Sequence, residues 1–232
     1  MRRNGFRVDP ISSQQLRNFA EDACQNWAVG FFDRNRKDLE ARGIDPKRLP
    51  PGQYFTDRFP VLHVGDVPRY PDLSKWDFTI SGRVERPFTL SWDELIARPS
   101  ESIVTDIHCV TKWSKFDTTW TGVPIADLLN EAGVKAGATH LMFHCEHGYT
   151  TNLPLNDVVA PPALLAYQFE GEPLAPEHGY PLRSLVPHLY LWKSAKWIRG
   201  MEVMVGDKPG FWERNGYNMY GDPFKEQRFT RD

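Results

Sequence analysis

The sequence predicts an α+β domain in which mixed β-sheets are surrounded by short helices. Three observations favour this class. The 232 residues include 8 Trp and 19 Pro, a composition typical of a loop-rich, aromatic-rich fold rather than a helical bundle. Residues 76–82 alternate apolar and polar side chains as a half-buried strand does. The segments with helical patterns in the main body of the chain are short, because prolines and glycines delimit them.

Composition and charge limit the function classes. With 41% hydrophobic and 25% charged residues, the chain has the composition of an ordinary soluble globular protein. A net charge of −2 argues against a nucleic-acid-binding protein, which normally carries a basic excess. Neither a Gly-rich phosphate loop nor a G-x-S-x-G elbow occurs, which argues against nucleotide binding and serine hydrolysis.

Cysteine usage and the N-terminus predict the compartment. The 3 cysteines are widely spaced and odd in number, so we expect no disulfide framework and a reducing compartment. The Arg2–Arg3 pair is not followed by an apolar run, so no signal peptide is expected. No apolar stretch reaches the ~18 residues that a membrane span needs. The predicted location is therefore the cytoplasm.

The chain is predicted to consist of an N-terminal helical extension, residues 1–43, and one main domain, residues 44–232, with an aromatic C-terminal tail. In the extension, Ser12 is an N-cap candidate and apolar residues recur at helical spacing up to Trp27. Gly43 is expected to end the helical region.

The first half of the main domain carries clear local patterns. Residues 44–75 are rich in proline and are expected to run extended over the domain surface. Ser91 followed by Glu94 forms a capping-box pattern, which predicts a short helix. A strand is expected at residues 102–110 and places Cys109 at its C-terminal end, where a side chain can meet a ligand.

Four further elements are expected in the second half. They are a helix from Pro124 to Gly133, a strand from His140 that runs into a loop by Tyr149, a helix from Asn156 that is bent at Pro161–Pro162 and includes Leu164 and Leu165, and a strand pair formed by residues 189–198 and 201–205. The helix from Pro124 is predicted because proline stands at its first position and glycine follows its last residue.

The functional prediction depends on Cys109. Free cysteine is among the most often buried residue types and usually acts as a small apolar filler, so the residue type alone favours a structural role. A metal ligand is one alternative. A cysteine nucleophile with a histidine base is another, although the adjacent His108 would point to the opposite side of a strand.

A second group of ligand-type side chains lies in one strand and the loop after it. Alternation places His140 and His144 on one face, and Cys145 and His147 on the other. One zinc ion cannot easily gather ligands from both faces, so strand polarity, or a role in supporting the ligands of another site, is favoured over a zinc site. A zinc or cysteine hydrolase using His144, Cys145 and His147 is kept as an alternative function.

Four ordered motifs then resemble the molybdopterin-binding domain of the sulfite oxidase family. They are Gly148–Leu155; Leu164–Tyr167 with Gly171–Leu174; His178–Arg183 with Val186–Pro187; and Lys193–Trp197. The resemblance covers roughly residues 50–206, and Cys109 falls where that family places its molybdenum-ligating cysteine. It implies a sulfite-oxidase-type domain and a molybdenum–molybdopterin cofactor.

The resemblance also implies roles for individual residues. Cys109 would supply a thiolate, a soft ligand, to molybdenum. The other residues that it implies at the cofactor are His178 and Arg183, which hold the pterin and its phosphate; Ser194, Ala195 and Lys196, which contact the cofactor through backbone and the lysine side chain; His63, a cofactor-contacting histidine; and Asn152, which stands where sulfite oxidases tend to have serine.

One departure from the family bears on the substrate. After the ligating cysteine, sulfite oxidases show an Asn-Arg-Arg type sequence that helps bind the sulfite anion, whereas this chain has Val110–Ser114. Lys112 and Trp113 are therefore the catalytic candidates for the substrate pocket, and sulfite is disfavoured. The expected reaction is two-electron oxygen-atom transfer on a small substrate, such as a sulfoxide or an N-oxide.

The larger relatives carry a haem domain and a dimerisation domain that are not found in this chain. The resemblance thus implies an external electron-transfer partner and allows a monomer. A non-catalytic pterin-binding module that has kept the fold is the rival hypothesis. The aromatic tail at residues 211–223 is expected to pack near the cofactor mouth.

Overall fold

The computed structural model describes residues 34–159 and 163–232, and the chain divides into two compact units, Met1–Pro46 and Lys47–Asp232. In the first unit, residues 34–41 are helical. The rest of the helix predicted from residue 12 lies outside the described residues, as do Pro161–Pro162.

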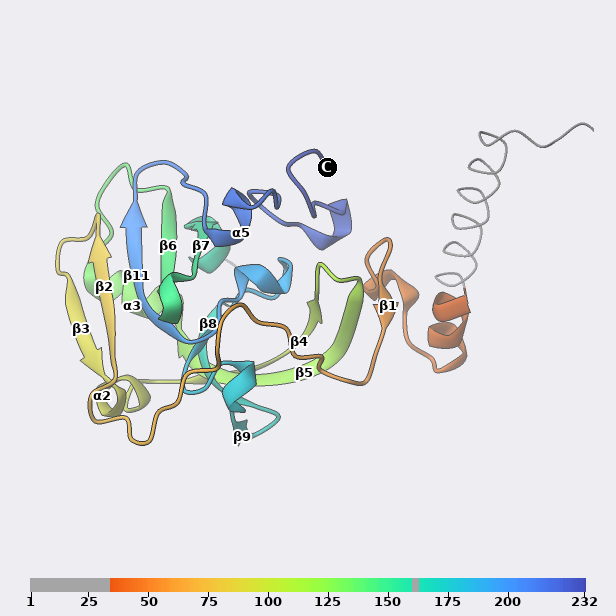
Figure 1. Cartoon of the computed structure of the whole chain (residues 1–232), viewed down its shortest axis with the longest axis horizontal. Helices are drawn as coiled ribbons and strands as arrows, with labels where there is room; N and C mark the ends of the chain where they lie inside the picture. Colours follow the sequence, from red (N-terminus) through yellow and green to blue (C-terminus); the bar gives the residue numbers. More distant parts are fainter. Residues whose placement is uncertain (1–33, 160–162) are drawn as a thin grey trace, which may run out of the picture. The chain divides into compact units, whose positions relative to one another are not determined.

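A five-stranded sheet forms one part of the larger unit, with strand order β3-β2-β11-β6-β7 (Figure 1). Strand β11 runs parallel to β2 and antiparallel to β6, so the sheet is mixed. The strands are β2 (Asp77–Gly82), β3 (Phe88–Ser91), β6 (His140–Cys145), β7 (Thr150–Pro154) and β11 (Ile198–Met204).

A six-stranded sheet forms the other part. Its path is β1-β5-β8-β10, with β4 on β5 and β9 on β8; β1 is parallel to β5, and the other pairs are antiparallel. The strands are β1 (Tyr54–Phe55), β4 (Glu101–His108), β5 (Trp113–Pro124), β8 (Leu164–Phe169), β9 (Glu172–Pro173) and β10 (Arg183–Leu185). The prediction of an α+β fold with mixed sheets is confirmed.

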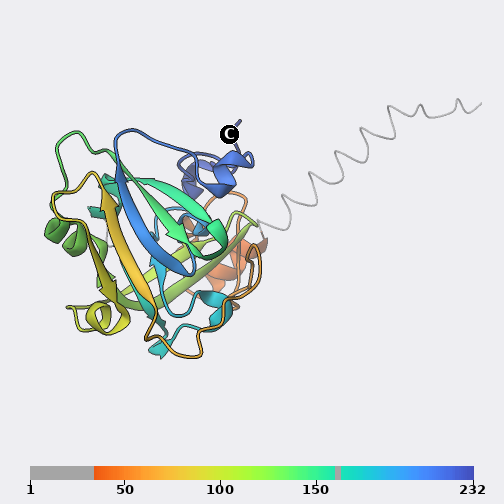
Figure 2. The ribbon, with the colours of Figure 1, turned by 60° about the vertical axis from the view of Figure 1, so that its left-hand side comes forward.

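The helices are short, and α2 and α3 lie at the margin of the five-stranded sheet (Figure 2). The predicted capping box is present: the Ser91 side chain accepts from the Glu94 amide, and the Glu94 carboxylate accepts from the Ser91 amide. The α-helices are α2 (Trp92–Ile96), α3 (Ile125–Ala132), α4 (Asn156–Val159) and α5 (Phe211–Arg214); the 3₁₀ helices are η1 (Pro46–Arg48), η2 (Glu146–Gly148), η3 (Pro176–His178), η4 (Leu191–Lys193) and η5 (Pro223–Lys225).

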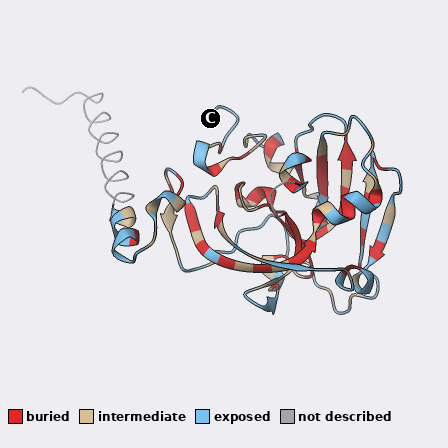
Figure 3. Ribbon diagram, turned by 180° about the vertical axis from the view of Figure 1, so that it is seen from behind, coloured by how far each residue is buried: buried red, intermediate tan, exposed pale blue. Residues whose placement is uncertain are grey.

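The buried side chains form two clusters, and buried positions concentrate along the strands (Figure 3). The larger cluster includes Phe78 and Ile80 of β2, whose alternation with exposed neighbours fits the prediction. The smaller cluster surrounds Trp120 and includes Cys109 and Trp113. Cys109 therefore lies at the edge of a core rather than on the outer surface.

Two predictions of local structure are wrong. Leu164 and Leu165 belong to strand β8 and not to a helix; both are buried between β5 and β10, so the run shows no alternation. Residues 189–198 do not form a strand that pairs with residues 201–205, because η4 turns the chain there and strand pairing begins only at Ile198. The long strand β5, in addition, was not predicted.

Candidate functional site

Cys109 lies in the tight loop that joins β4 to β5. Its amide donates to the Trp113 carbonyl at 2.8 Å, and the Lys112 amide donates to the Cys109 carbonyl at 3.0 Å. Lys112 has φ 74°, in the left-handed region, which lets so short a loop close. Within the loop the Cys109 sulfur is 3.1 Å from the Thr111 hydroxyl oxygen.

A cavity of about 330 Å³ lies beside this loop. Most of the residues predicted at the cofactor line it. They are His63, Cys109, Trp113, Arg183, Ser194, Ala195 and Lys196. Residues from three distant parts of the sequence thus share one wall, as the ordered motifs imply.

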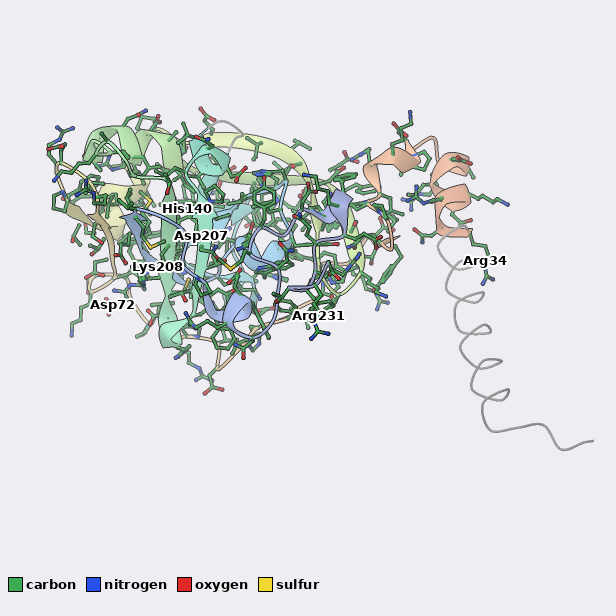
Figure 4. The ribbon with its side chains drawn as sticks, turned by 90° about the horizontal axis from the view of Figure 1, so that it is seen from above. Arg34, Asp72, His140, Asp207, Lys208 and Arg231 are labelled. Atoms are coloured by element: carbon green, nitrogen blue, oxygen red, sulfur yellow. The ribbon has the colours of Figure 1, made fainter. Side chains whose placement is uncertain are left out.

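Three other predicted residues are not among those that line the cavity. Lys112 is exposed at the tip of the loop. Asn152 is fully buried on β7, where its amide donates to Asp207 at 2.7 Å and its side-chain oxygen accepts from Lys193 at 2.9 Å. Asp207 in turn lies 3.8 Å from the His140 ring, and both are labelled in Figure 4. The part that Asn152 plays in this structure is to hold β7 to the following segments.

His178 is the third predicted residue that is not among those lining the cavity. Its ring stacks on Phe59, with centroids 3.9 Å apart and planes 8° from parallel, and Phe59 itself lines the cavity. The His178 carbonyl accepts from Arg183 at 2.9 Å. His178 therefore supports the wall from behind.

Arg183 places a cation in the interior. It is 1% exposed, and its guanidinium donates to the carbonyls of His178 and Ser194, each at 2.9 Å. Burial lowers its pKa to about 10, which leaves it charged at neutral pH. Among the described residues no carboxylate pairs with it. A buried cation without a counter-ion is costly, so this wall is suited to an anionic ligand.

Lys196 adds a second cation. Its ammonium donates to the carbonyls of Leu62 and Glu177, each at 2.7 Å. Burial and the charge of Arg183 lower its pKa to about 7. Two of its three N–H groups are thereby engaged, and one is left for a ligand.

Two buried polar atoms at or behind the wall have no hydrogen-bond partner within the described residues: Trp113 Nε1 and His178 Nδ1. Buried polar groups are nearly always paired, so these two atoms are exceptions, but both are buried and neither is exposed to the cavity. The two cations and the cysteine sulfur on the cavity wall fit a phosphate-bearing, sulfur-ligated metal cofactor.

The C-terminal segment completes the cavity. Trp212, on α5, and Tyr217 line it, and α5 packs on β7 (Figure 1). Burial, and next the charge of Cys109, raise the pKa of Tyr217. The sequence predicted that the aromatic tail packs near the cavity, but neither residue was named as a site residue, because nothing local marks them.

The tail is held by a buried ion pair. The Lys193 ammonium and a Glu213 carboxylate oxygen are 2.6 Å apart, and both side chains are 0% exposed. The same carboxylate oxygen accepts from the Trp192 indole at 2.9 Å, and Lys193 also donates to the Met219 carbonyl at 2.7 Å. These contacts fix α5, and with it Trp212, beside the motif that contains Ser194 and Lys196.

The position of His178 predicts an acid-dependent loss of stability. Burial, with the charges of Arg183 and Lys196, lowers the pKa of His178 to about 4. Between pH 6.5 and about 4 the unfolded chain binds a proton that the folded chain does not, so stability falls as pH falls through this window. His178→Phe keeps an aromatic ring against Phe59 and should lose less stability than the wild type between pH 7 and pH 5 in urea unfolding; an equal loss in both proteins would contradict this.

Comparison with known proteins identifies the family. A family model described as the oxidoreductase molybdopterin binding domain matches residues 64–212. The chain belongs to this family. The resemblance to the sulfite oxidase family is thereby confirmed, and the protein is an oxidoreductase of the molybdopterin-binding class.

Similar curated proteins carry related names. The uncharacterized oxidoreductase YuiH of Bacillus subtilis (strain 168) is 54% identical over 185 residues, which cover 80% of this chain and 93% of that protein. The putative protein-methionine-sulfoxide reductase subunit YedZ1 of Azospira oryzae is 29% identical over 206 residues, 87% of this chain and 78% of that protein. The protein-methionine-sulfoxide reductase catalytic subunit MsrP of Gluconobacter oxydans is 30% identical over 164 residues, 63% of this chain and 52% of that protein.

A solved structure shows the same fold. The sulfane dehydrogenase SoxCD from Paracoccus pantotrophus superposes with a TM-score of 0.59 at 22% identity, covering 67% of this chain and 44% of that chain. This molybdopterin-binding fold agrees with the two mixed sheets and short helices described above.

Strand β6 carries His140, His144 and Cys145 of the group of ligand-type side chains. Within residues 34–159 and 163–232, no group of three or more His, Cys, Asp or Glu side chains is placed to hold a metal ion. His144 is exposed and lies 3.1 Å from Glu202, whereas Cys145 faces the core. His144 and Cys145 thus lie on opposite faces, as the alternation predicts, whereas His147 does not share the face of Cys145: it is exposed in η2, where its φ of 58° takes the chain out of the strand. In the same described part of the chain, no helix is long and apolar enough to cross a membrane.

Proposed function

We propose that this molybdopterin-binding domain holds a molybdenum–molybdopterin cofactor through Cys109 and reduces a sulfoxide by two-electron oxygen-atom transfer. The observation that carries the proposal is that one cavity wall presents a cysteine sulfur, the buried cation Arg183 and the partly buried cation Lys196. Electrons come from an external partner, and the compartment is the cytoplasm.

Each residue has a distinct role in the proposed cofactor binding. Cys109 gives molybdenum a soft thiolate ligand. Arg183 and Lys196, which line the cavity, offset the negative charge of the phosphate. When bound, the cofactor supplies the two-electron chemistry, and the protein supplies orientation and electrostatics.

The reaction consumes two protons and two electrons: the S–O bond breaks, the oxygen leaves as water, and the sulfide is released. Tyr217 lines the cavity, and its hydroxyl group can donate a proton.

Two observations favour a sulfoxide over sulfite. The cavity is lined by the aromatic rings of Trp113, Trp197, Trp212 and Tyr217, which suit the apolar substituents of an organic sulfoxide, whereas sulfite has none. Two of the relatives above are named protein-methionine-sulfoxide reductases.

The experiment is elemental analysis of protein purified from a host that makes the cofactor. We expect near-stoichiometric molybdenum in the wild type and its loss in Cys109→Ser. Cys145→Ser is the matched control, since Cys145 is also buried but does not line the cavity. Molybdenum absent from the wild type would contradict the proposal.

The same preparations separate the rival functions. A reduced-dye assay with sulfoxides, N-oxides and sulfite should show oxidation of the dye with sulfoxides. Bound pterin without turnover on any substrate would favour the binding module. Stoichiometric zinc that persists in Cys109→Ser would favour the hydrolase.

A further inference from the structure

Thr111 stands next to the sulfur that the proposed function assigns to the metal. Its hydroxyl oxygen is 3.1 Å from Cys109 Sγ, which is within hydrogen-bond distance, and both residues line the cavity. The loop that sets this distance is closed by backbone bonds, from the Cys109 amide to Trp113 and from the Lys112 amide to Cys109. The Thr111 side chain is therefore not needed to close the loop.

The direction of this hydrogen bond follows from the chemistry of the sulfur. A metal-bound thiolate carries no proton, so it can only accept, and the threonine hydroxyl must donate.

A hydrogen bond to a metal-ligating sulfur withdraws electron density from it. The sulfur then donates less to the metal, which disfavours the oxidised metal relative to the reduced one and raises the reduction potential. We infer that Thr111 is a positioning residue whose hydroxyl donates to the Cys109 thiolate and thereby raises the reduction potential of the metal that Cys109 holds. This inference rests on the proposed function.

The hydrogen bond from Thr111 changes the driving force of the reaction through the reduction potential. A higher potential makes the reduced site a weaker reductant, so Thr111 limits the force for removing oxygen from a sulfoxide. It also makes the site easier for an electron partner to reduce.

The test uses holoenzyme with measured molybdenum content, with Thr111→Val as the variant of matched shape and Thr111→Ser as the variant that keeps the hydroxyl. Redox titration should give a more negative potential for Thr111→Val than for the wild type. The sulfur-to-metal charge-transfer band should move to lower energy, because the sulfur is then more electron-rich. Thr111→Ser should retain the wild-type potential and band, and Thr111→Ala should reproduce the shifts of Thr111→Val.

The results of this test distinguish a failure of the role assigned to Thr111 from a failure of the proposed function. If Thr111→Val and Thr111→Ala bind molybdenum but have the wild-type potential and band, Thr111 does not tune the metal, and the proposed function stands. If Thr111→Ser shifts as far as Thr111→Val, the hydroxyl is not the cause and the inference fails. If the wild type holds no molybdenum, both fail together.

Discussion

Glu213→Leu should lower the free energy of unfolding by about 3–5 kcal/mol, the usual cost of leaving one member of a buried ion pair without its partner. The Lys193 ammonium would lose the carboxylate at 2.6 Å while both positions remain closed to water. Burial already lowers the pKa of Lys193, so its charge is costly where it stands. Trp192 would also lose the acceptor of its indole N–H. Urea unfolding followed by tryptophan fluorescence measures the change.

The matched control is the double variant Lys193→Met/Glu213→Leu, which removes both charges and keeps apolar volume. It should recover much of the loss, because replacing a buried ion pair by apolar side chains is often close to neutral. Lys193 also donates to Asn152 and Met219, so some loss should persist. A double variant no more stable than Glu213→Leu would show that the uncompensated charge is not the cause.

Arg183→Lys should cost about 1.5–3 kcal/mol and should reduce cofactor content, although the charge is kept. The planar guanidinium donates at once to the carbonyls of His178 and Ser194, and a single ammonium cannot reproduce that fork. The wall between η3 and the Ser194 segment would then lose its link. Molybdenum content and urea unfolding are measured on the same preparation.

Arg199→Lys is the control for the Arg183 experiment. Arg199 pairs with Asp77 and Glu146 in a partly exposed network, where surface ion pairs contribute ~1 kcal/mol or less. Cofactor content should stay at the wild-type level. If Arg183→Lys behaved like Arg199→Lys in both measurements, the role assigned to the Arg183 fork would be wrong.

Local chemistry explains which elements could be predicted from the sequence. The Ser91 and Glu94 side chains satisfy the first backbone groups of α2 within four residues of chain, so the pattern alone predicts the helix start. Gly133 likewise ends α3 with φ 69°. Both signals depend on neighbours in sequence, and both predictions are confirmed.

Elements set by distant partners could not be predicted in this way. The apolar pair Leu164–Leu165 lies in a strand because β5 and β10 flank it, and a run buried on both faces has neither strand nor helix period. The segment 189–198 is rich in aromatic and apolar residues, as strands are, but it carries the buried Lys193, whose partners come from β7 and the tail.

The same distinction between local patterns and distant contacts applies to the residues of the site. Ordered motifs and the family resemblance were enough to bring His63, Cys109, Arg183 and Lys196 to one cavity. They could not separate residues on the wall from those behind it: His178 packs on Phe59, and Asn152 binds Lys193. Nor could they name Trp212 and Tyr217, whose place follows from an ion pair between residues 193 and 213.

The Lys193–Glu213 ion pair joins two parts of the cavity wall that are separated in the sequence. Every strand in the described part of the chain ends at or before Met204, whereas Trp212 and Tyr217 follow it. The segment that completes the cavity wall therefore adds no strand to either sheet, and its position depends on the Lys193–Glu213 ion pair rather than on backbone pairing within a sheet.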